Sequence, residues 1–91
     1  MKTGQDSWRK LMDHIHEIIV VEGRHDTQRL KKYFDCETIE TGGSSIDDKV
    51  IEQIRHAASR QGVIVFTDPD TPGNQIRHII NQHVPNCKNA F

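Results

Sequence analysis

Three acidic residues, Glu22, Asp68 and Asp70, are the side chains in this sequence best placed to do chemistry. Glu22 ends one short apolar run, and the two aspartates follow another. In extended backbone, residues i and i+2 point to the same side, and Pro69 biases Asp68 toward the extended region. We therefore expect both aspartates to face one spot, with Glu22 close by if the two apolar runs are neighbouring strands.

Carboxylates gathered in this way need a compensating proton or charge. Two unit charges ~4 Å apart repel by roughly 4 kcal/mol at an effective dielectric near 20. Either one carboxyl group keeps its proton through a raised pKa, or a cation lies among them. Oxygen ligands from two or three side chains, with room left for water, suit Mg²⁺ or Mn²⁺ better than Zn²⁺. An Asp-x-Asp alone is also common in surface turns, but its combination with Glu22 favours a metal site.

A phosphate site is expected at the same place. Gly42, Gly43 and Ser44 precede a helical pattern, so free backbone N–H groups and the positive end of a helix would favour an anion there. A tight turn followed by a helix cap explains the same residues equally well. Arg24, close to Glu22, either reaches a phosphate oxygen or lies solvated at the surface.

The elements that must position these residues follow one repeated order along the sequence. Each repeat consists of an apolar strand, a turn and a segment with the apolar spacing of a helix. Such strands are expected at residues 17–22, 38–41 and 63–67. Strands joined through helices run parallel, and runs without alternation are typical of strands covered on both faces. Loops that leave the carboxyl ends of parallel strands share one edge, where ligands bind. The sequence predicts a compact, Rossmann-like α/β fold, a parallel sheet with helices on both faces.

The ends of the expected helices carry recognisable signals. The apolar stripe of the first helix comprises Leu30, Tyr33 and Phe34. Ser45 followed by Asp48 resembles a capping box at the start of the second helix, and Gly62 suits its left-handed end. Thr71 before Pro72 starts the third helix, because proline at the first helical position loses no hydrogen bond.

The two ends of the chain are predicted less directly. Residues 1–16 form an N-terminal extension that carries Trp8, Leu11, Met12 and Ile15 at helical spacing. This spacing favours a helix, and an expression extension is the alternative. Residues 86–91 look like the approach to a fourth strand, so we expect the domain at 17–91 to be truncated at its C-terminal end.

Composition limits the possible classes of protein. Ninety-one residues, 34% hydrophobic and 27% charged, suit one small globular domain, and a net charge of -1 excludes a polycation that coats nucleic acid. The apolar runs are far shorter than the roughly 20 residues of a membrane helix. The first residues do not resemble a signal peptide, so we expect a cytoplasmic protein without membrane contact. Cys36 and Cys87 are expected to be free thiols.

The two acidic segments, 20–26 and 67–73, together resemble the toprim domain shared by topoisomerases, primases and some nucleases. The connecting stretches are similar to the N-terminal toprim domain of the maturase family that trims precursor 5S ribosomal RNA. These stretches are residues 38–44, 50–55, 62–67 and 84–91. The resemblance covers about 17–91.

The resemblance implies a Mg²⁺-dependent endoribonuclease, with Mn²⁺ as a substitute. Asp68 and Asp70 would hold the metal, and Glu22 would serve as ligand or general acid/base. A metal among the phosphate oxygens would stabilise the transition state and activate the attacking water. By the same resemblance, the substrate would be a double-stranded region of precursor 5S ribosomal RNA, presented with the help of a ribosomal protein.

Two other functions are compatible with parts of the same sequence pattern. A haloacid-dehalogenase-like phosphatase also places Asp-x-Asp after an apolar strand, with the first aspartate as nucleophile. Such folds carry the motif early, whereas 21 residues follow Asp70 here, which is too few for the rest of that fold. The second rival is a catalytically silent toprim module that binds metal, nucleic acid or a partner protein. The sequence does not exclude this module.

Overall fold

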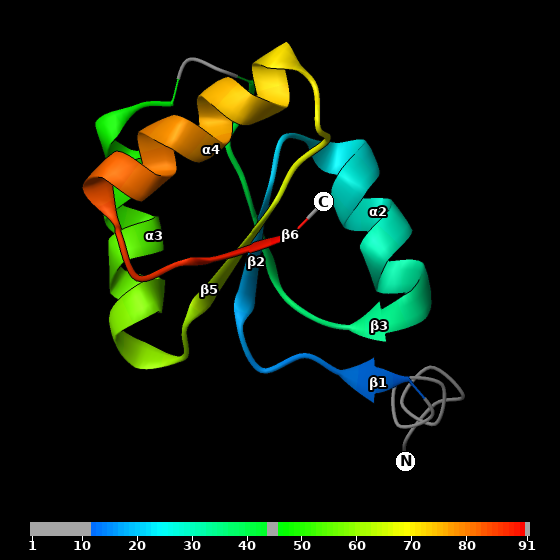
Figure 1. The fold of residues 1–91 in the computed structure, drawn as a ribbon. Coiled ribbons are helices and arrows are strands. Elements are labelled where there is room, and N and C mark those ends of the chain that lie inside the picture. The colour runs from blue at the N-terminus through cyan, green and yellow to red at the C-terminus, as the bar shows by residue number, and fades with distance from the viewer. Residues whose placement is uncertain (1–11, 44–45, 91) are drawn as a thin grey trace.

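A parallel four-stranded sheet forms the centre of the molecule in the computed structural model, which describes residues 12–43 and 46–90 (Figure 1). The strand order is β4-β2-β5-β6, and every neighbouring pair is parallel. The strands are β2 (Ile18–Val21), β4 (Thr38–Glu40), β5 (Val63–Phe66) and β6 (Lys88–Ala90). The predicted parallel sheet is confirmed, and the expected fourth strand is present as β6.

Three helices connect these strands and cover both faces of the sheet. They are α2 (Arg24–Tyr33), α3 (Asp48–Arg60) and α4 (Thr71–His83). Figure 1 shows α2 on one side of the sheet and α3 with α4 on the other. Successive side chains of β2 point to opposite faces of the sheet. Val20 packs with α3 and α4, while Ile19 and Val21 pack on the other face with Leu30. The predicted α/β architecture is confirmed.

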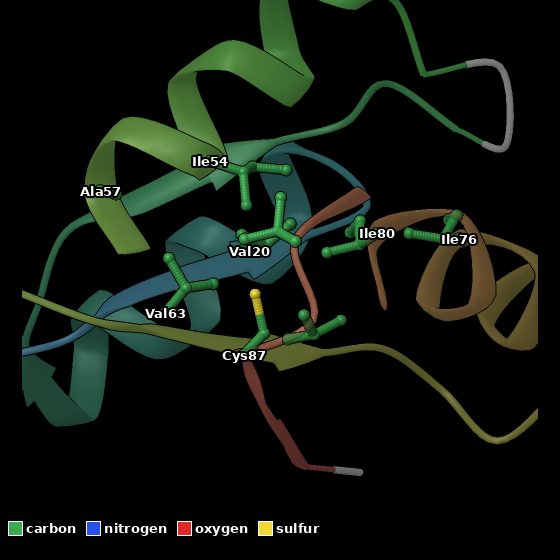
Figure 2. Close-up of a cluster of buried hydrophobic side chains, with 9 residues drawn as sticks. Val20, Ile54, Ala57, Val63, Ile76, Ile80 and Cys87 are labelled. Atoms are coloured by element: carbon green, nitrogen blue, oxygen red, sulfur yellow. The ribbon is translucent and has the colours of Figure 1, made fainter. Parts of the chain in front are cut away.

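The larger core lies between the sheet and the pair α3 and α4. Figure 2 shows Val20 between Ile54 of α3 and Ile80 of α4, with Val63 and Ile76 in the same cluster. Val20, Ile54, Ile76 and Ile80 have no exposed surface, and full burial of such a side chain contributes about 1.5–3 kcal/mol. This packing fixes β2 and β5, the two strands after which the acidic residues follow.

The N-terminal extension differs from the expected helix where it is described. Residues 1–11 lie outside the described residues, and β1 (Asp13–His14) pairs in parallel with β3 (Phe34–Asp35). The backbone N–H of Ile15 donates to the carbonyl of Asp35 at 3.0 Å. This pairing holds residues 13–15 extended, so the helix prediction is wrong for this part of the extension.

The first helix is also shorter than its apolar stripe suggested. Phe34 already belongs to β3 and packs into the smaller core from there, together with Leu30. Tyr33, the last residue of α2, is 66% exposed. The predicted stripe is therefore right for Leu30 and wrong for Tyr33, because the chain leaves the helix to pair with β1.

The start of α3 is capped at another residue than predicted. The side chain of Asp47 accepts from the N–H of Val50 at 3.0 Å and caps α3, while Ser45 lies outside the described residues. The predicted start of the third helix at Thr71 is confirmed, and Asp70 is its cap. At the end of α3, Gly62 has φ +91°, which confirms the expected left-handed exit.

Two smaller expectations can be compared with the described part of the chain. Neither Cys36 nor Cys87 forms a disulfide, as expected, and both are buried. Among residues 12–43 and 46–90, no helix is long and apolar enough to cross a membrane.

Candidate metal centre

Glu22 is held at the carboxyl end of β2 by hydrogen bonds that continue the sheet beyond its last paired residues. The N–H of Thr41 donates to the carbonyl of Val21, and the N–H of Gly42 donates to the carbonyl of Glu22, both at 2.9 Å. The side chain of Glu22 is half-buried and makes no hydrogen bond or ion pair with another described residue. Its backbone is fixed while its carboxylate stays available.

Asp68 lies beside Glu22 because β2 and β5 are direct neighbours. Val20 is opposite Val65 in the parallel register, and two further steps along both strands bring Glu22 opposite Thr67. Asp68 is the next residue, and its exposed carboxylate has no partner among the described residues. Parallel register therefore places the two acidic residues at one edge of the sheet.

Asp70 has a structural task in addition to any ligand role. Its Oδ1 accepts from the N–H of Gly73 at 2.8 Å, which satisfies one free donor at the start of α4. A Cβ atom at Gly73 would lie 2.0 Å from the backbone oxygen of Asp68. Only glycine fits here, so Gly73 lets α4 begin directly against the Asp68 loop.

Arg77 of α4 stabilises this loop and was not predicted from the sequence. The buried guanidinium donates to the carbonyl and hydroxyl of Thr67 at 3.2 and 3.0 Å. It also donates to the side chain of Asn89 at 3.1 Å and to the carbonyl of Ala90. Burial lowers the pKa of Arg77. One side chain thus ties α4 and β6 to the residue that precedes Asp68.

A signal for Arg77 was present in the sequence. Gly73, Arg77, Ile80 and Val84 follow one another at steps of four, three and four residues, which places them on one helix stripe. The other three residues on this stripe are buried. A cation at such a position indicates a buried arginine with hydrogen-bond partners.

The structure brings the three predicted carboxylate residues to one edge but does not close their side chains around a point. Within residues 12–43 and 46–90, no three or more His, Cys, Asp and Glu side chains form a group that could hold a metal ion. One oxygen of Asp70 accepts from the N–H of Gly73 as a helix cap. The metal assignment of Glu22, Asp68 and Asp70 therefore stays a prediction.

The residues predicted to bind phosphate differ in what the structure shows of them. The N–H of Gly42 already donates to the carbonyl of Glu22, so this donor belongs to the sheet edge, and a phosphate role of Gly42 stays a prediction. Gly43 has φ +111°, a left-handed conformation that favours glycine, and Ser44 lies outside the described residues. Arg24 is exposed in the first turn of α2, close to Glu22.

A comparison with known protein families shows to which family the chain belongs. The model of the Toprim domain matches residues 17–91. This chain belongs to the toprim domain family. Toprim domains bind divalent metal ions, and the match has the same bounds as the resemblance inferred from the motifs.

Several known proteins similar to this toprim chain have the same name. Over 77 residues, the chain is 62% identical to ribonuclease M5 of Lactococcus lactis and 61% identical to ribonuclease M5 of Bacillus subtilis. It is 53% identical to ribonuclease M5 of Staphylococcus aureus. Each comparison covers 85% of this chain but only 37%, 41% and 43% of those proteins. The chain thus spans about two fifths of the length of these relatives.

The chemistry of the donors at the toprim edge fits a hard divalent cation. Glu22 and Asp68 contribute carboxylates without partners among the described residues, and Asp70 keeps one oxygen beyond the one that caps α4. Carboxylate oxygens with room for water suit Mg²⁺ and Mn²⁺.

Proposed function

We propose that this chain is the toprim domain of a Mg²⁺-dependent endoribonuclease that cleaves precursor 5S ribosomal RNA. The observation that carries the proposal is the adjacency of Glu22 and Asp68 at the carboxyl ends of two neighbouring parallel strands. The identity of 62% to a protein named ribonuclease M5 supports RNA as the substrate class.

The proposal gives each residue of the edge a role. Asp68 and Asp70 hold Mg²⁺, or Mn²⁺ as a substitute, and Glu22 is a further ligand or the general acid/base. The bound ion supplies charge neutralisation at the phosphate and lowers the pKa of bound water. Arg24 and the backbone of Gly43 contact phosphate oxygens of the RNA, Arg24 by a charge-assisted hydrogen bond. Ser44 belongs to this phosphate set as well.

The proposal extends to a protein of the length of these relatives, of which the chain spans about two fifths. In such a protein, the regions outside the matched segment contribute affinity for the RNA. A ribosomal protein presents the precursor, and the reaction takes place in the cytoplasm. The length of the relatives, more than twice that of the matched segment, supports a role for further regions in RNA binding.

Cleavage of precursor 5S RNA with Mg²⁺ tests the proposal. The chain is compared with its Glu22→Gln and Asp68→Asn variants, and the ribonuclease M5 of Bacillus subtilis confirms that the substrate is intact. Loss of the ligand or base is expected to lower the rate at least about 100-fold. Glu37→Gln is the matched control, because Glu37 is an exposed acid just before β4, at the opposite edge of the sheet.

Metal binding gives a readout that does not depend on cleavage. Titration with Mn²⁺, followed by electron paramagnetic resonance, is expected to show binding to the wild-type chain and to Glu37→Gln but not to Asp68→Asn. Binding of Mn²⁺ without cleavage of RNA would favour the silent toprim module. If Asp68→Asn binds Mn²⁺ as tightly as the wild-type chain does, the proposed metal centre is refuted.

A further inference from the structure

One face of α2 carries a group of exposed polar side chains that the candidate metal centre does not use. Positions i, i+3, i+4, i+7 and i+8 of a helix lie on one side. On α2 these positions are His25, Gln28, Arg29, Lys32 and Tyr33, which line an open hollow of about 380 Å³. We call these five residues the α2 outer face.

The α2 outer face carries two positively charged side chains that form no ion pair with the described residues. Neither Arg29 nor Lys32 forms an ion pair with any residue in the part of the chain that the structure describes. The one acid of the helix, Asp26, is turned to the N-terminal end, where its side chain accepts from the N–H of Gly23 at 3.2 Å. Because the whole chain has a net charge of -1, this is a local concentration of positive charge.

The position of the face connects it with the candidate metal centre. The cap of α2 is Gly23, the residue directly after Glu22, so the helix begins at the acidic edge of the sheet. Ten residues at about 1.5 Å each extend roughly 15 Å from there. Figure 1 shows α2 running along the outside of the sheet from that edge. A polymer held at the metal centre therefore has the α2 outer face beside it.

We propose that the α2 outer face binds the phosphate backbone of double-stranded RNA next to the cleaved bond. This inference rests on the proposed function, because that function supplies the polyanion at the neighbouring edge. Arg, Lys, Gln and Tyr side chains are donors to phosphate oxygens. Single-stranded RNA is less suited, because it is held by several aromatic side chains in series and this face has only Tyr33.

The chain offers a matched control on α3. Asp48, Lys49, Glu52, Gln53 and His56 line a similar exposed face there. Glu52 forms an ion pair with Arg55. The acids Asp48 and Glu52 lie on the same helix face as the basic residues. Removal of two bases from α3 changes the net charge as much as removal of two bases from α2, but it leaves the α2 outer face intact.

Binding of labelled duplex RNA, followed by fluorescence anisotropy, tests the inference. The duplex has about 16 base pairs, the length that small duplex-binding domains span. EDTA is present, so neither metal binding nor cleavage contributes. The 91-residue chain is compared with the double variants Arg29→Gln/Lys32→Gln and Lys49→Gln/Arg55→Gln. Glutamine keeps helix propensity close to that of Arg and Lys, and thermal unfolding checks that each variant folds.

The expected result is a change in affinity and in its salt dependence for the α2 variant alone. Two lost phosphate contacts reduce the slope of log K against log salt by about 1.8, measured between about 50 and 200 mM. At the low end of this range, the affinity falls at least about tenfold. The α3 variant keeps the slope and the affinity of the wild-type chain.

Three results would overturn the inference. They are an equal loss in both double variants, tighter binding of a single strand than of the duplex, and binding of polyglutamate as tight as that of the duplex. Cleavage remains a separate measurement. If the chain binds duplex RNA through α2 but does not cleave precursor RNA with Mg²⁺, the proposed function is refuted and the inference about the α2 outer face holds. If the chain cleaves the RNA but does not bind the duplex through α2, only the inference about the α2 outer face is refuted.

Discussion

At the scale of single residues, Gly73 determines whether α4 can start against the Asp68 loop. A methyl group there would lie 2.0 Å from the backbone oxygen of Asp68, and backbone cannot move aside as a flexible side chain does. We expect Gly73→Ala to lower the free energy of unfolding by about 1–3 kcal/mol, measured by urea denaturation. A Cβ atom at Gly23 would meet nothing within 4 Å, so Gly23→Ala should cost clearly less. Equal losses would contradict this explanation.

Arg77 gives a second prediction for a single residue. It donates to Thr67 and Ala90 from a buried position, and a hydrogen bond from a charged group contributes about 1.5–3 kcal/mol. Arg77→Met should therefore lower the free energy of unfolding by at least about 2 kcal/mol in urea. The exposed Arg60→Met should change it by less than about 0.5 kcal/mol. A similar loss for both variants would show that Arg77 acts only through its charge.

Residue types explain why the acidic edge was easier to predict than the role of Arg77. Glu22 and Asp68 follow uninterrupted apolar runs, and that pattern alone predicts that they lie at strand ends. Arginine is almost never buried unless it is paired. The position of Arg77 on the buried stripe indicates its burial, but its partners are largely backbone carbonyls, which the sequence does not identify. The carboxylate of Asp70 is likewise shared with a helix cap that depends on local geometry.

At the scale of elements, the start of α3 depends on Asp47. Its side chain satisfies the N–H of Val50, and loss of such a cap costs about 1 kcal/mol. Asp47→Ala should lower the midpoint of thermal unfolding, whereas Asp47→Ser, which retains a capping oxygen, should stay close to the wild-type chain. If both variants melt alike, the cap does not stabilise α3.

The helices and strands with long apolar patterns were predictable, and their short connections were not. Residues 18–21 and 63–66 became the central strands, as expected. The pairing of β1 with β3 involves two residues on each side and needs contacts between distant parts of the chain, so no local pattern indicates it. For the same reason the end of α2 at Tyr33 could not be distinguished from a continued helix.

At the scale of the whole molecule, the two cysteines report on opposite faces of the sheet. Cys87 belongs to the larger core and Cys36 to the smaller one, and both are buried. Both should react slowly with a thiol reagent in the native chain and fast in urea, which mass spectrometry can follow for each site. Fast labelling of Cys36 alone would show that the α2 side opens independently.

Burial also makes the stability of the fold depend on pH at the alkaline end. Desolvation raises the pKa of Cys87 above that of an unfolded thiol. A group with a raised folded-state pKa contributes stability that is fully present below the unfolded pKa and is lost as the pH rises through the folded one. Urea midpoints should therefore fall as the pH rises past the usual range of a thiol, and less so in Cys87→Ala. An equal decrease in both chains would exclude the thiol as the cause.

The two strands that deliver Glu22 and Asp68 are the inner pair of the sheet, flanked by β4 and β6. Their amide protons are shielded on both sides, so deuterium from the solvent should reach them only when the entire domain opens. The acidic edge is consequently anchored to the slowest-exchanging part of the protein, with Glu22 one residue beyond β2 and Asp68 two residues beyond β5. Any motion that admits a substrate must then come from the surrounding loops and side chains, while the spacing between the two strand ends stays constant for the lifetime of the folded state.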